Sequence, residues 1–103
     1  MNEVYERLLA EMLAKWPDMK VEVKKTQISF KNRFMFACAS KASGNRLRLT
    51  FSLPYRAESE RILQATEPYP MRWTHHVVLK SIGDIDDEVM GWLGQAYDFG
   101  MNK

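Results

Sequence analysis

The sequence has little of several features that would point directly to a function. Cys38 is the only cysteine, and it lies in an apolar segment where we interpret it as an inert core residue. No internal disulfide can form, which suits a reducing cytoplasm. The five glycines are scattered and build no phosphate-binding loop. No apolar run approaches the roughly 20 residues that span a bilayer, and the N-terminus lacks the layout of a signal peptide. We therefore expect a soluble cytoplasmic protein without a membrane segment.

Strong charge of one sign is also missing. The formal net charge is only +2, with 15 basic and 13 acidic side chains, so charge alone predicts no nucleic-acid partner. What the chain does have is an ordinary globular composition, with 46% hydrophobic and 27% charged residues over 103 positions. That length fits a single domain, residues 1–103, with one hydrophobic core.

Two amphipathic helices are predicted near the two ends of the chain. In the first, over residues 3–16, apolar side chains recur at three- and four-residue spacing until a proline ends the pattern. The second covers residues 84–99. Asp84 is its predicted N-cap, and the acidic residues that follow suit the positive end of the helix dipole. The apolar stripes of the two helices place Trp16 and Trp92 in the core.

Between the helices the apolar period changes to two, which indicates β-strands. Residues 46–53 alternate most clearly, with leucine and phenylalanine on one face and arginine, threonine and serine on the other. The residues before them, 41–46, have the composition of a turn. Residues 54–71 hold three of the four prolines, and we predict a short helix at 57–65 within a longer loop. The order of elements predicts an α+β fold, a mainly antiparallel sheet of about five strands with the N- and C-terminal helices packed on one face.

Two adjacent histidines in the predicted strand RWTHHVVLK are the most conspicuous site candidates. Neighbouring side chains of a strand point to opposite faces, so His75 and His76 cannot hold one metal ion unless the strand bulges. Leu79 belongs in the core, which places His75 on the core side as a hydrogen-bonded histidine at the core margin. His76 then shares the opposite face with Lys80, where a ligand contact and a solvated position are equally open. A cationic neighbourhood predicts a mostly neutral His76 at neutral pH.

Alternation gathers polar and cationic side chains on one face of the sheet, which we call the polar sheet face. Its predicted members are Gln27, Ser29, Lys31, Arg46, Arg48, Thr50, His76 and Lys80. The adjoining segment adds Arg72 and the aromatic rings of Tyr55 and Trp73. Arginine binds anions through paired hydrogen bonds, and cations interleaved with aromatic rings bind single-stranded nucleic acid. The alternative is a face that is only solvated, which is common in antiparallel sheets.

These features predict a binding or interaction module that takes an anionic small molecule or nucleic acid on the polar sheet face. The residues expected to contact the ligand are Gln27, Arg46, Arg48, Arg72, Trp73, Thr74 and His76. A small enzyme is the alternative, with His76 as general acid or base beside Arg48 and Thr50. A protein partner or a homodimer formed through the sheet is a third interpretation. No cofactor is predicted, and no metal, because a helix N-terminus accounts for the acidic residues at 84–88.

Three blocks of the sequence resemble a known family. They are VEVKKTQISFKNRFMFACAS, RLRLTFSLP and RWTHHVVLKSIGDIDDEVMGWLGQAY, and together they span almost the whole chain. The chain resembles a small bacterial domain family of unknown function that is loosely labelled a predicted transport protein domain. TQISF, THHV and the final helix are the most specific parts. The resemblance implies an α+β fold with Thr74, His75 and His76 in a signature strand, and it implies no activity. Transport itself is at odds with a chain that has no membrane segment.

Overall fold

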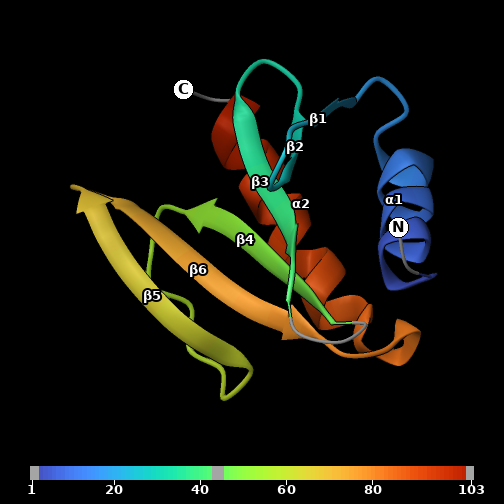
Figure 1. Ribbon diagram of the computed structural model, residues 1–103. Helices are drawn as coiled ribbons and strands as arrows, with labels where there is room; N and C mark the ends of the chain where they lie inside the picture. The colour runs from blue at the N-terminus through green and yellow to red at the C-terminus, as the bar shows by residue number, and fades with distance from the viewer. Residues whose placement is uncertain (1–2, 43–45, 102–103) are drawn as a thin grey trace.

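The computed structural model describes residues 3–42 and 46–101, which form two α-helices and one sheet of six strands (Figure 1). In chain order the elements are α1 (Glu3–Lys15), β1 (Lys20–Val23), β2 (Ile28–Lys31), β3 (Met35–Lys41), β4 (Leu47–Leu53), β5 (Ile62–Tyr69), β6 (Arg72–Leu79), the 3-10 turn η1 (Ile82–Asp84) and α2 (Asp87–Met101). The strands lie in the order β1-β2-β3-β4-β6-β5, and every neighbouring pair is antiparallel. The predicted α+β class is confirmed, with six strands in place of about five. Within the described residues no helix is long and apolar enough to cross a membrane.

Both helices contribute to one core on the same side of the sheet. In Figure 1, α2 runs behind β3 and β4, and α1 lies to one side of it near η1. The side chains that fill this core include Val4, Leu8 and Met12 of α1, Leu47, Leu49, Phe51 and Leu53 of β4, and Val89, Trp92, Leu93 and Ala96 of α2. In β4 every second residue is buried, as the alternation predicts, so one face of the sheet meets the helices and the other is left to the polar residues.

The two helix tryptophans meet the core to different depths. Trp92 is 7% exposed and its ring stacks on Phe51, with the centroids 5.5 Å apart. Trp16 is half-buried just after α1, where it stacks on Tyr97 at 4.9 Å and meets the ring edge of Phe36 at 5.8 Å. Both indoles therefore contact the core as predicted, and Trp16 does so at the margin.

The predicted short helix at 57–65 is wrong, because β5 begins at Ile62 and pairs with β6 along the edge of the sheet. The register of β5 shifts between Ile62 and Gln64 and again between Thr66 and Tyr69. These irregularities interrupt the period-two pattern by which a strand is recognised in sequence. Pro68 is tolerated in β5 because an edge strand pairs on one side only.

The connections before α2 and between β3 and β4 bear on two local predictions. Asp84 is not the N-cap of α2, because η1 intervenes and the Val89 N–H donates to Asp86 Oδ1 at 3.1 Å. Asp84 Oδ2 instead accepts from the Lys80 N–H at 2.8 Å. The turn predicted at 41–46 falls largely on residues 43–45, which lie outside the described residues.

Replacing Trp92 by alanine is expected to lower the free energy of unfolding by about 3–5 kcal/mol, because the change removes a buried ring and leaves a cavity beside Phe51. Trp16→Ala is expected to lower it less, by about 1–3 kcal/mol, since that ring is half-buried. Urea denaturation followed by circular dichroism measures both values. The control is Leu63→Ala, at a position that is 61% exposed in β5, with an expected change within about 0.5 kcal/mol. A loss below about 1 kcal/mol in Trp92→Ala would contradict the assigned helix face.

Candidate functional site

A row of polar side chains crosses the polar sheet face from β2 to β5. The strand registers align Ser29, Cys38, Thr50, His76 and Gln64. Thr50 Oγ1 lies 2.9 Å from His76 Nδ1, and the Thr50 hydroxyl is also within hydrogen-bonding reach of the Cys38 thiol. Three adjacent strands therefore supply a continuous chain of thiol, hydroxyl and imidazole.

The electrostatics of this row favour the neutral forms of its titratable groups. Partial burial lowers the pKa of His76, and the positive charge of Arg48 lowers it further, which agrees with the predicted neutral imidazole. Burial raises the pKa of the Cys38 thiol, against smaller opposing effects of Thr50 and Lys24. The Thr50 hydroxyl has one proton, which it can donate either to an unprotonated His76 Nδ1 or to the Cys38 sulfur. The row therefore joins a thiol, a hydroxyl and an imidazole whose uncharged forms are favoured.

His75 lies on the opposite face and has a structural role. Its side chain is fully buried, its ring stacks on Phe51 at 5.2 Å, and its Nε2 accepts a hydrogen bond from the Ala57 N–H at 2.9 Å. Burial lowers the pKa of His75, although the backbone of Phe51 and Trp73 has a smaller opposing effect. The prediction of a hydrogen-bonded histidine on the core side is confirmed, although His75 is fully buried rather than at the core margin, and its hydrogen bond fixes the loop before β5 against β6.

The separation of the two histidines also bears on metal binding. They lie on opposite sides of β6, as the strand period requires. Among the described residues, no group of three or more histidine, cysteine, aspartate or glutamate side chains is placed to hold a metal ion.

One end of the polar sheet face carries cations around an open hollow of about 320 Å³, which we call the arginine hollow. Its lining residues are Ser40, Lys41, Ala42, Arg46, Arg48 and Val78. Glu22 is the only acidic residue in β1–β4 and β6, and its carboxylate is already engaged with Lys31 at 2.9 Å and Lys24 at 3.4 Å. No ion pair joins the three cations of the arginine hollow to any residue in the described part of the chain.

A β-bulge creates a second hollow, of about 310 Å³, farther along the same face. The register of β2 and β3 shifts at the end of β2, which leaves Phe36 as an extra residue in β3. Phe36 turns toward the helices, where its ring meets Trp16 and Tyr97. The Phe36 ring is thus withdrawn from the polar sheet face beside Ser52, where Met35 is another lining residue from β3. We call this hollow the bulge groove, and its lining residues are Met35, Phe36, Ala37, Cys38, Thr50, Phe51, Ser52, Pro68, Arg72 and Thr74.

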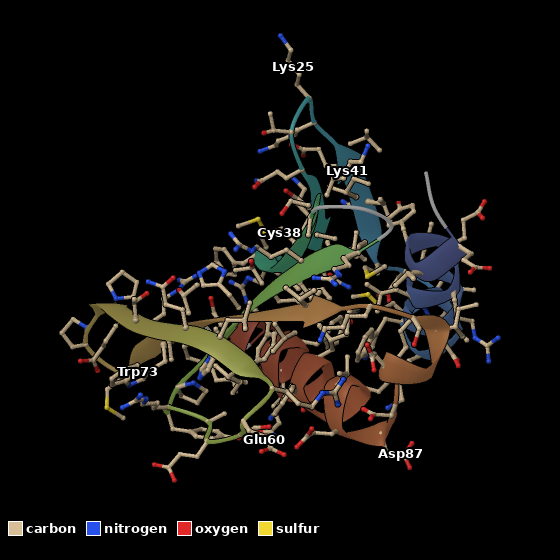
Figure 2. All side chains as sticks on the ribbon, turned by 60° about the horizontal axis from the view of Figure 1, so that its bottom comes forward. Lys25, Cys38, Lys41, Glu60, Trp73 and Asp87 are labelled. Carbon is tan, nitrogen blue, oxygen red and sulfur yellow. The ribbon has the colours of Figure 1, made fainter. Side chains whose placement is uncertain are left out.

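Five of the seven residues predicted to contact a ligand lie on this face or line its hollows. They are Arg46, Arg48, Arg72, Thr74 and His76. Ser52 and Cys38 belong to the same surface and were missed as site residues. Cys38 is half-buried rather than a core residue, and its alternation with the buried Ala37 and Ala39 is the signal that places it here. Figure 2 shows Cys38 on the side of the sheet away from α2.

The other two predicted residues line neither hollow. Trp73 pairs with Leu53 and shares the helix-facing side of β6 with His75, so its ring is directed away from Arg48. Gln27 follows the tight turn that joins β1 to β2, where its carbonyl accepts from the Lys24 N–H at 2.8 Å. The tip of this hairpin, marked by Lys25 in Figure 2, projects away from the rest of the sheet.

Arg61, just before β5, has a structural role. Its Nη1 lies 3.0 Å from Asp86 and 3.1 Å from Glu88, and its Nη2 donates to the Asp84 carbonyl at 2.7 Å. These contacts tie the start of β5 to the start of α2, so Arg61 is not available to a ligand on the polar sheet face.

The fold and these surfaces define a small α+β domain with an open, cationic sheet face. The chain belongs to the family described as a domain of unknown function (DUF5655), whose model matches residues 1–100. This agrees with the resemblance to an unknown-function domain, and the family description names no activity and no transport role. A search of curated proteins and a search of solved structures gave no match.

Replacing Arg48 by glutamine is expected to raise the pKa of His76, because the change removes a positive charge that disfavours the imidazolium form. NMR titration of the imidazole resonances measures this pKa directly. Arg7→Gln on α1 is the control and should leave His76 unchanged. An unaltered pKa in Arg48→Gln would show that the arginine hollow and the Cys38–Thr50–His76 row are electrostatically independent.

Acidification is expected to destabilise the fold through His75. Its folded-state pKa is lowered, so below the unfolded-state pKa of about 6.5 the unfolded chain binds a proton that the folded chain does not. The neutral His75 therefore stabilises the folded state fully above about pH 6.5, and this stabilisation is lost as the pH falls toward the folded-state pKa. His75→Gln should flatten the decline in the free energy of unfolding between about pH 7.5 and about pH 5.5. Urea denaturation at both values tests this, and an equally steep decline in the variant would contradict it.

Proposed function

We propose that the protein is a binding module for a small anionic ligand, held by a phosphate or similar group in the arginine hollow. The observation that carries this proposal is a cluster of Lys41, Arg46 and Arg48 around an open hollow without an acidic partner among the described residues. Two guanidinium groups offer the paired donors that suit anionic oxygens. Ser40 supplies a hydroxyl at the same hollow.

A compact anion is favoured over single-stranded nucleic acid. Binding of a single strand combines cationic contacts with aromatic rings on which bases stack. Trp73 is directed to the helix side of the sheet, and the Tyr55 hydroxyl bonds to Gln95 of α2. These two rings, expected at the margin of the polar sheet face, therefore support no stacking beside Arg48.

The enzyme alternative is favoured by one observation, the 2.9 Å contact between Thr50 and His76. A neutral His76 oriented by a hydroxyl meets two requirements of a general acid or base. The hollows on the face are open, however, and acid–base chemistry gains most in a site that closes over its substrate. Binding is therefore the function we favour, and a cytoplasmic location and a protein partner stay predictions.

Titration of the isotope-labelled protein with inorganic phosphate tests the proposal by NMR. Phosphate is expected to shift the amide signals of Ala42, Arg46 and Arg48, and the double variant Arg46→Gln/Arg48→Gln should lose these shifts because the guanidinium donors are gone. The matched control is Arg7→Gln/Arg33→Gln, which removes two arginines outside the hollow.

Higher salt should weaken phosphate binding, since exposed charges are screened. A short oligothymidylate is titrated in parallel. Saturable oligonucleotide binding much tighter than phosphate binding would replace the small-ligand proposal with a nucleic-acid one. The absence of any shift in the hollow up to about 10 mM phosphate would overturn the binding function itself.

A further inference from the structure

We propose that the bulge groove is a second ligand site, which takes a small carboxylic acid with a compact apolar body. Arg72 binds the carboxylate, and the hydroxyls of Thr50, Ser52 and Thr74 orient the ligand. The site uses none of the residues of the arginine hollow and does not rest on the function proposed for it.

The groove is formed by the backbone bulge in β3 and not by the conformation of a surface side chain. In a regular antiparallel pair, residue 36 would face the same side as Ser52 and fill the space beside it. The bulge sends Phe36 to the helix side instead, where Tyr97 meets its ring at a centroid distance of 5.2 Å. A Cβ placed on Gly100 would lie only 3.4 Å from the Phe36 Cβ. The absence of a side chain at Gly100 therefore lets Phe36 pack closely against α2. Core packing therefore holds the groove open, and bulges that redirect a side chain are typical of functional sites.

The charge in the groove selects an anion. No acidic residue lines it, and Arg72 is half-buried without an ion pair or side-chain hydrogen bond to the described residues. A partly buried guanidinium without a partner is stabilised by a planar carboxylate, because its two parallel N–H donors match the two carboxylate oxygens. One cation among neutral hydroxyls suits a singly charged group.

The remaining lining gives the size and polarity of the ligand. Ser52 and Thr74 are directly paired across β4 and β6, and Thr50 is the next residue on the same face of β4. Met35 and Pro68 supply apolar contacts from β3 and β5. A hollow of about 310 Å³ is at the lower end of the range for small-molecule sites, so the apolar body is no larger than a single ring or short chain.

Thr50 connects the groove to His76. Thr50 is one of the lining residues and its hydroxyl is 2.9 Å from His76 Nδ1, whereas His76 itself is not part of the lining. A ligand that takes up the Thr50 hydroxyl changes the hydrogen bond that His76 receives. The imidazole resonances of His76 therefore report occupancy of the groove from outside it.

NMR titration with sodium benzoate, and with uncharged benzamide as its matched control, tests the site. Benzoate is expected to shift the amide signals of Ser52 and Thr74 and the ring signals of His76, and benzamide to bind at least about tenfold more weakly. Arg72→Gln should weaken benzoate binding by at least about tenfold. Ser52→Leu should abolish it by filling the groove without changing the charge, and circular dichroism verifies that both variants are folded.

Arg48→Gln separates this proposal from the function proposed for the arginine hollow. It should leave benzoate affinity within about twofold while it weakens phosphate binding, and Arg72→Gln should do the reverse. The carboxylate site is overturned if benzamide binds as well as benzoate, if Arg72→Gln or Ser52→Leu binds benzoate like the natural sequence, or if no groove signal moves up to about 10 mM benzoate.

Discussion

The pairing of β4 with β6 is the interaction on which the rest of the structure depends. It runs from Leu47 opposite Leu79 to Leu53 opposite Trp73 and joins two interior strands of the sheet. A slip of one residue would turn the leucines of β4 to solvent and break the contact between Thr50 and His76, because Thr50 would then face the helix side of the sheet. The buried stripe of α2 excludes that slip, because it packs on the leucine side. Burial of apolar side chains on one face therefore fixes a polar contact on the other.

The alternation of side chains along β6 places the two histidines on opposite faces, where they have different roles. Burial is the largest effect that lowers the pKa of each. For His75 the neutral form is required by structure, since its Nε2 must stay unprotonated to accept from the Ala57 N–H. For His76 the neutral form allows Nδ1 to hydrogen-bond the Thr50 hydroxyl at 2.9 Å on the polar sheet face. A neutral imidazole therefore holds the loop before β5 on one side of β6 and bonds to a threonine hydroxyl on the other.

Sequence patterns predicted the features that a local period determines and missed those that distant partners determine. The two helices, the faces of β4 and the division of the histidines all follow from spacing alone. The edge strand β5 was missed because its bulges break the period, and Cys38 was assigned to the core because its neighbours are apolar, although its alternation with Ala37 and Ala39 places it on the polar sheet face. The bulge groove had no local signal. It exists because Phe36 packs on Tyr97, a residue about sixty positions away in the chain.

The ion pairs of the described residues leave out the cations of the arginine hollow. A face under selection for stability alone would pair opposite charges across neighbouring strands, and like charges placed together cost stability. Here Asp86 and Glu88 are engaged with Arg61 at the start of α2, and Glu22 is engaged on the β1–β2 hairpin. Arg46 and Arg48 are left together at one hollow without an acidic partner among the described residues. That arrangement contributes no ion pair to the stability of the fold among the described residues, and it is the basis on which we propose a binding function for the cluster.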